Sequence, residues 1–170
     1  MACVPPRADM GTATLERAAW LSLRTKKRII EADEFDTGER QLLNFGHTFG
    51  HALEAATGMA LPHGLGVAVG MRAAITYAAA GAHADVETLD RYAAALAAQA
   101  GAAGWAPPTV DWTGFTAAFE SDKKHTAEHY RLVLPAADGR LHVVAEPRTQ
   151  TTLERVVAAA QQAWDRLWAW

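Results

Sequence analysis

Two histidines lie four residues apart in a segment that also carries an arginine, an asparagine and a glutamate. The segment reads Arg40-Gln-Leu-Leu-Asn44-Phe-Gly-His47-Thr-Phe-Gly-His51-Ala-Leu-Glu54. On an α-helix this spacing places the five polar side chains within about a quarter of the circumference. Four apolar side chains fall on the opposite side of the same helix, where they can pack: Leu42, Phe45, Phe49 and Leu53.

The chemistry that this stripe suggests is metal binding. Histidines at positions i and i+4 of a helix can chelate one metal ion. Gly46 and Gly50 each weaken the helix by about 1 kcal/mol relative to alanine, and they leave room beside the imidazoles for a ligand or another backbone. The alternative is an ordinary surface helix with two exposed histidines. The nearby His63-Gly64 favours the functional reading.

Helices must position most of these residues, because alanine, the best helix former, is the commonest residue. The first helix is predicted over residues 14–32 with Thr14 as N-cap, and the second over 39–56, stopped by Gly58. Residues 61–64 form a connector, and a third helix is expected over 66–80, ending at Gly81.

The second half of the chain is predicted to contain three further helices and one hairpin. Asp85 caps a helix over 86–100, Asp111 caps a short helix reaching Phe119, and Thr151-x-x-Glu154 reads as a capping box for the last helix. Residues 130–134 and 141–144 flank a turn and predict a β-hairpin. The fold class is therefore mainly α with one small β-hairpin, in a single domain over residues 1–170.

Composition excludes several classes of protein. The net charge of −3 gives no reason to expect binding to nucleic acid or a membrane surface. The single cysteine, Cys3, excludes a disulfide framework and fits a reducing cytoplasm. The apolar stretch over 67–80 is too short to span a bilayer, and we read no signal peptide. No glycine-rich nucleotide-binding motif is present.

Beyond these general properties, the histidine segment resembles the signature of 3-dehydroquinate synthase and its sugar phosphate cyclase relatives. The resemblance rests on Leu42–Glu54 followed by His63-Gly-Leu-Gly-Val-Ala-Val-Gly-Met71. It continues upstream through Lys26 and through Asp33-Glu34 to Arg40. Downstream it includes Asp122-Lys-Lys124 and the strand after it. It spans roughly residues 15–167.

The resemblance implies that the chain corresponds to the helical C-terminal, metal- and substrate-binding domain, without the N-terminal NAD-binding domain. The family converts 3-deoxy-D-arabino-heptulosonate 7-phosphate to 3-dehydroquinate by transient oxidation with NAD, phosphate elimination, re-reduction, ring opening and aldol closure. The implied partner is thus a sugar phosphate. The chain is then either a C-terminal fragment or one half of a split gene, and in the second case a separate NAD-binding half is a further partner. Whether the chain also forms a homodimer through its tryptophan-rich last helix is left open.

Site roles follow from the same resemblance. His47 and His63 would bind the metal, zinc or cobalt. His51, Asn44 and Lys124 would face the substrate phosphate, and Lys26 and Arg40 its carboxylate. Fixed cations and amide donors at both ends suit such an anion. The plainer alternatives are a solvated Lys26, an Arg40–Asp36 surface pair, a surface Lys123-Lys124 pair and an ordinary loop histidine at position 63.

The implied ligand set is incomplete, because no residue matches the glutamate that is the family's third metal ligand. Two protein ligands would bind zinc less tightly than three. We therefore expect the isolated chain to fold, to bind zinc weakly and to be inactive without the NAD-binding half. Two other functions stay open: a related cyclase that makes another cyclitol, and a non-catalytic helical module that binds a partner.

Overall fold

The computed structural model of the chain describes residues 12–35, 38–78, 98, 104–136, 138 and 140–167. The elements follow in chain order: helix α1 (Thr12–Ala32), 3-10 helix η1 (Glu39–Asn44), helices α2 (His47–Ala56), α3 (His63–Ala78) and α5 (Trp112–Glu120), strands β1 (His129–Pro135) and β2 (Leu141–Pro147), and helix α6 (Gln150–Leu167). The described residues are thus mainly helical with one antiparallel hairpin, which confirms the predicted fold class.

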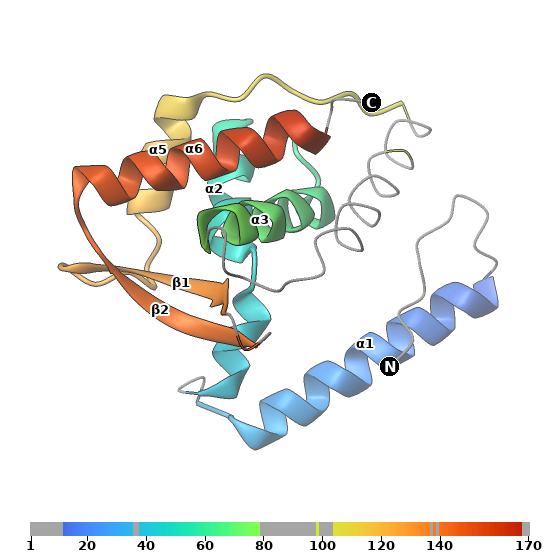
Figure 1. Cartoon of the computed structure of the whole chain (residues 1–170). Helices are drawn as coiled ribbons and strands as arrows, with labels where there is room; N and C mark the ends of the chain where they lie inside the picture. The colour runs from blue at the N-terminus through green and yellow to red at the C-terminus, as the bar shows by residue number, and fades with distance from the viewer. Residues whose placement is uncertain are drawn as a thin grey trace.

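Helix α3 lies at the centre of the main body, packed against α2 on one side and α6 on another (Figure 1). Helix α5 packs on α2, and strand β1 packs against α3. Aromatic and aliphatic side chains from all of these elements form one buried core; its largest fully buried members are Tyr130, Phe49, Phe115, Phe119, Leu53, Leu132, Val69 and Val156. This core fixes α2 and the first turn of α3 side by side.

Helix α1 is placed differently, because it extends away from the main body and packs chiefly against η1 (Figure 1). None of its described side chains is buried, and Trp20 and Leu23 are 56% and 68% exposed. The helix begins at Thr12, so Thr14 lies inside it and is not its N-cap. The predicted end at Ala32 is confirmed.

The predicted single helix over 39–56 is wrong. Residues 39–44 form the 3-10 helix η1, the chain turns at Phe45, and α2 starts only at His47. Gly46 has φ +79°, a left-handed conformation that glycine adopts without the steric cost paid by other residues. Arg40 and Asn44 therefore do not share a continuous helical face with the two histidines.

Glycines allow α2 and α3 to cross with their backbones in contact. A Cβ at Gly70 would lie 2.0 Å from the Gly46 carbonyl oxygen, and one at Gly50 would lie 2.9 Å from the Gly66 carbonyl oxygen. Because these neighbours are backbone atoms, they cannot move aside as a side chain would. Of the two explanations for Gly46 and Gly50, the close approach of another backbone is confirmed.

Helix α3 begins at His63, three residues before the predicted start. His63 is therefore the first residue of a helix and not part of a loop. Gly58, with φ +60°, ends α2 as predicted. Its amide and that of Met59 donate to carbonyls of the last turn, at Ala55 and Glu54. Gly81 and the predicted helix over 86–100 lie outside the described residues, apart from residue 98.

The remaining elements match their predictions closely. Asp111 caps α5 by accepting a hydrogen bond from the Thr113 amide at 3.0 Å. The hairpin pairs Leu132 with Val144, in a register that alternates buried and more exposed residues along β1. Helix α6 starts one residue before Thr151, and the Thr149 hydroxyl accepts the Thr152 amide at 3.2 Å. The capping threonine is thus Thr149, not Thr151.

Candidate metal and substrate site

Three imidazoles meet where α2 crosses the start of α3. The ring centroid of His47 lies 5.5 Å from that of His51 and 5.5 Å from that of His63. The rings of His51 and His63 are 5.8 Å apart and nearly parallel. Two imidazoles that share one zinc at 2.0–2.1 Å from each nitrogen have centroids about 5 Å apart. The separation of His47 and His63 therefore fits a shared ion.

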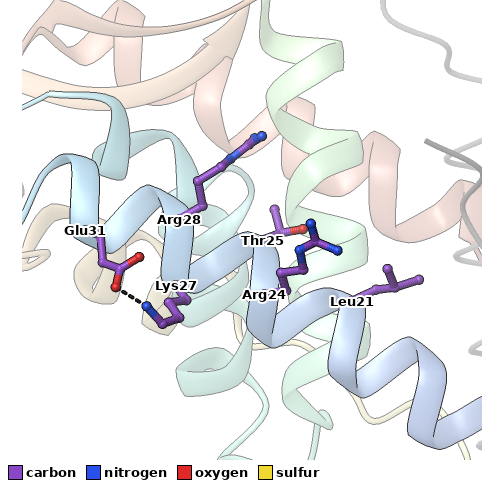
Figure 2. Close-up of a pocket in the computed structure, with 6 residues that line it drawn as sticks. All are labelled: Leu21, Arg24, Thr25, Lys27, Arg28 and Glu31. Atoms are coloured by element: carbon purple, nitrogen blue, oxygen red, sulfur yellow. Dashed lines mark hydrogen bonds and ion pairs between the residues drawn. The ribbon is translucent and has the colours of Figure 1, made fainter.

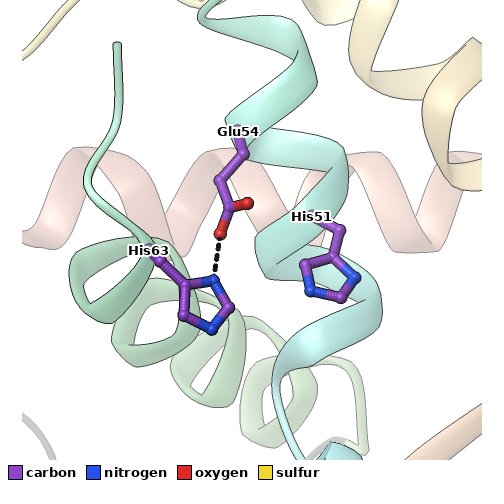
Figure 3. Close-up of side chains that lie close together, drawn as sticks. All are labelled: His51, Glu54 and His63. Carbon is purple, nitrogen blue, oxygen red and sulfur yellow. Dashed lines mark hydrogen bonds and ion pairs between the residues drawn. The ribbon is translucent and has the colours of Figure 1, made fainter. Parts of the chain in front are cut away.

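Glu54 joins this histidine cluster from the next turn of α2 (Figure 3). One ligand atom each from His51, Glu54 and His63 lie within 4.8 Å of one another. Glu54 is buried, and its Oε1 is 2.8 Å from Nδ1 of His63. Imidazole nitrogens and carboxylate oxygens are the donors that zinc takes, so the residues present fit a divalent metal ion.

The surroundings of His47 favour its neutral form. Its Nδ1 lies 3.3 Å from the Phe45 carbonyl oxygen, in the turn that separates η1 from α2. Burial lowers the pKa of His47 below its ordinary value of 6.5, and the neighbouring His51, His63 and Lys124 lower it further against the effect of the Phe45 carbonyl. A neutral imidazole is the form that binds metal.

Lys124 brings a positive charge to the same cluster, since its charge acts on the pKa of His47. Its ammonium donates to Oδ2 of Asp122 at 2.9 Å, and its backbone amide donates to Oδ1 of the same residue at 3.0 Å. Burial acts to raise the pKa of Asp122, but the two hydrogen bonds and the charge of Lys124 outweigh it and hold that pKa below its usual value. The pair is more than half buried, so it is a fixed structure and not two solvated charges.

Among the described residues, the three other predicted substrate residues make no hydrogen bond or ring contact with the histidines. Asn44 ends η1 three residues before His47 and is half-buried. The guanidinium of Arg40 donates to the Glu34 carbonyl oxygen at 2.8 Å, while the Arg40 amide donates to Asp33 at 3.0 Å. Asp36, its alternative partner, lies outside the described residues.

Lys26 is exposed on α1, among the other cations of that helix. A pocket of about 500 Å³ opens beside the same helix (Figure 2). The described residues that line it are Leu21, Arg24, Thr25, Lys27, Arg28 and Glu31. Lys26 is not among them. Within the described part of the chain, Lys26 makes no hydrogen bond or ion pair with the histidines.

Two acidic residues at the site received no role from the sequence. Glu54 was recognised only as a member of the polar stripe, and Asp122 only as part of a motif. The spacing of Glu54 in the sequence could have indicated that it belongs to the site, because a residue three positions after His51 lies about one turn further along the same helix face. Its burial could not be foreseen, since it depends on where α3 crosses.

The fold and the site together define a helical domain with a histidine- and carboxylate-containing centre suited to a divalent metal and an anion. The sequence pattern of the family described as 3-dehydroquinate synthase C-terminal matches residues 7–125, which include every predicted site residue. The chain therefore belongs to the 3-dehydroquinate synthase family and corresponds to its C-terminal domain.

Curated relatives agree with this assignment. The chain is 36% identical over 154 residues to the 3-dehydroquinate synthase of a Synechococcus species, which covers 90% of this chain and 40% of the relative. It is 36% identical over 153 residues to that of Brucella ovis, covering 85% and 40%. Over 71 residues, 41% of this chain and 19% of the relative, it is 55% identical to that of Bradyrhizobium diazoefficiens. The chain thus spans two fifths of the first of these relatives.

No helix among the described residues has the length and apolar character needed to cross a membrane.

Proposed function

We propose that this chain is the metal- and substrate-binding half of a 3-dehydroquinate synthase. Its substrate is 3-deoxy-D-arabino-heptulosonate 7-phosphate and its product 3-dehydroquinate, in the shikimate pathway to aromatic amino acids. NAD binds to the N-terminal, NAD-binding half of the family fold, and without that half the chain is inactive. The cytoplasmic location expected of such an enzyme stays a prediction.

In this proposal His47 and His63 hold a divalent metal, zinc or cobalt. When bound, that metal supplies Lewis-acid polarisation of the substrate hydroxyl that is oxidised. The observation that carries the proposal is the meeting of His47 and His63, 5.5 Å apart, in a chain of this family. The lowered pKa of His47 supports it, because protons compete less with the metal for this ring.

The remaining residues bind the two anionic ends of the substrate. His51, Asn44 and Lys124 contact the phosphate, and the Asp122 carboxylate holds Lys124 in place beside His47. Arg40 and Lys26 take the carboxylate. Since Lys26 is exposed on α1 and Arg40 is engaged with the Glu34 carbonyl, this end of the site is completed only when substrate and the second half are bound.

Exposed apolar side chains support the need for a second half. Trp20 and Leu23 on α1, and Phe35 just after it, are 56%, 68% and 84% exposed. Trp20 and Leu23 are three residues apart on α1, which places them on neighbouring turns of one helix face, and contiguous exposed apolar side chains mark contact sites with other proteins. This surface is where we expect the NAD-binding half to lie.

The test is reconstitution of phosphate release. The chain is mixed with a separately expressed NAD-binding half of a 3-dehydroquinate synthase, NAD, zinc and the seven-carbon substrate, and free phosphate is measured. We expect release only when both halves are present. Release by this chain alone would overturn the proposed division of labour. Complex formation without release would favour the partner-binding module, and release with another sugar phosphate alone would favour a related cyclase.

A further inference from the structure

A buried carboxylate stands behind one of the proposed metal ligands. Glu54 lies on α2 with only 10% of its side chain exposed, whereas 60% of the His63 side chain is exposed. A charged group in such a place is costly unless it is paired and hydrogen-bonded. Among the described residues, its hydrogen-bond partner is Nδ1 of His63, 2.8 Å from Oε1.

The first turn of α3 leaves a space that this carboxylate fills. A Cβ on Gly66 would lie 2.9 Å from Oε1 of Glu54 and 3.3 Å from its Cγ. The buried side chain of Leu61 borders the same position on Gly66, at 3.4 Å. A Cβ at position 66 would force the carboxylate to shift, so Gly66 leaves open the space in which Oε1 lies.

The hydrogen bond determines which nitrogen of His63 carries the proton. An ionised carboxylate can only accept, so Nδ1 carries the proton and Nε2 keeps its lone pair. His47 is held in the same way, because the Phe45 carbonyl can only accept from its Nδ1. The ring of His51 has no hydrogen bond within the described part of the chain. The two proposed ligands therefore share a feature that the third imidazole lacks.

We infer that Glu54 is a positioning residue, whose carboxylate orients His63 through Nδ1 and so presents Nε2 to the metal. The inference rests on the proposed function in taking His63 as a ligand. Carboxylates behind metal-bound histidines fix the ring orientation and raise the basicity of the nitrogen that binds.

The competing role for Glu54 is that of a direct ligand together with His51 and His63. The distance argues against it. Two donors bound to one tetrahedral zinc at 2.0–2.1 Å lie about 3.4 Å apart, whereas Oε1 and Nδ1 lie at the shorter distance of an N–H···O hydrogen bond.

The first test is made on the metal-free protein. Long-range proton–nitrogen NMR at pH 8 should show His63 with its proton on Nδ1. In Glu54→Gln, which keeps the shape of the side chain but removes its charge, that preference should weaken. A wild-type His63 with its proton on Nε2 would overturn the inference, whether or not the chain binds metal.

The second test is titration with Zn²⁺ alone. Glu54→Gln should weaken zinc binding about 10- to 100-fold, with an unchanged circular dichroism spectrum. Glu146→Gln is the matched control, since it removes a carboxylate that pairs with Arg155, and it should bind zinc like the wild type. X-ray absorption of the zinc-loaded wild type should show no Glu54 oxygen bound.

The outcomes separate the inference from the proposed function. Zinc affinity of Glu54→Gln within twofold of wild type, or a zinc-bound Glu54 oxygen, would contradict positioning. A wild-type chain that binds no zinc would instead remove the proposed metal site, while the NMR result would still decide how His63 is held.

Discussion

His47 and His51 lie one turn apart on α2, yet their surroundings differ. The Nδ1 of His47 is held by the Phe45 carbonyl at 3.3 Å and its pKa is lowered mainly by burial. His51 is exposed. A ring that is fixed by a hydrogen bond is the better metal ligand, whereas an exposed ring is free to donate a hydrogen bond to a phosphate.

We therefore expect His47→Ala to abolish zinc binding and His51→Ala to retain it. The measurement is calorimetric titration of each variant with Zn²⁺. His142→Ala is the control, because this exposed histidine pairs with Asp138 in the hairpin turn and should change nothing. Equal losses in the His47 and His51 variants would contradict the division of roles.

His125 makes the stability of the chain depend on pH. Its Nδ1 accepts the Arg131 backbone amide at 3.0 Å, which requires an unprotonated nitrogen. Burial lowers the pKa of His125, and Arg148 and Lys124 lower it further, while Asp122 acts in the opposite direction. The unfolded chain therefore takes up this proton first as the pH falls. Stability present above pH 6.5 decreases below it, through the lowered pKa of the folded state.

His125→Asn removes this titration while it keeps an acceptor near the position of Nδ1. The wild-type urea midpoint should fall between pH 7.5 and pH 5.5, and the fall should be smaller in the variant. His47 has a lowered pKa too, so part of the pH dependence will remain. An identical fall in both proteins would show that His125 does not contribute.

At the scale of elements, the crossing of α2 and α3 carries the site. Gly70→Ala would place a methyl group 2.0 Å from the Gly46 carbonyl oxygen and 2.8 Å from the Gly50 nitrogen. Because overpacking of this kind costs about 1–3 kcal/mol or more, we expect a clear loss in the free energy of unfolding, measured with urea. The same substitution should also weaken zinc binding, because it displaces the backbone at Gly46, directly before His47.

Gly64→Ala is the matched control on the same helix. No atom lies within 4 Å of its added Cβ, and alanine favours a helix by up to about 1 kcal/mol over glycine. This variant should be as stable as the wild type or more so. A Gly70→Ala protein of unchanged stability would mean that the two helices can separate without cost.

The elements also show what periodicity can and cannot predict. The ends of α1 and α2 and the cap at Asp111 were predictable, because they depend on local residues such as Gly58. The break at Gly46 was not, since the spacing of the polar residues is the same whether or not the helix is interrupted. Glycine is needed at position 46 for a second reason, because a Cβ there would lie 2.6 Å from the Met71 nitrogen and 2.7 Å from the Val67 carbonyl oxygen of α3.

At the scale of the whole molecule, the sequence predicted the composition of the cluster better than its geometry. The family motif predicted site roles for His47, His51, His63 and Lys124, and these residues lie close together in the structure. It did not predict that Lys26 would lie on a helix extending from the main body. Contacts of that kind depend on tertiary packing, which no local pattern encodes.

The position of a bound zinc ion tests the central claim most directly. Crystals of the chain grown with Zn²⁺ would locate it by anomalous diffraction at the zinc edge. We predict one peak at the crossing of α2 and α3, about 2.0–2.1 Å from Nε2 of both His47 and His63. A peak held by His51 and the Glu54 carboxylate without His47, or no peak among the three imidazoles, would contradict the account.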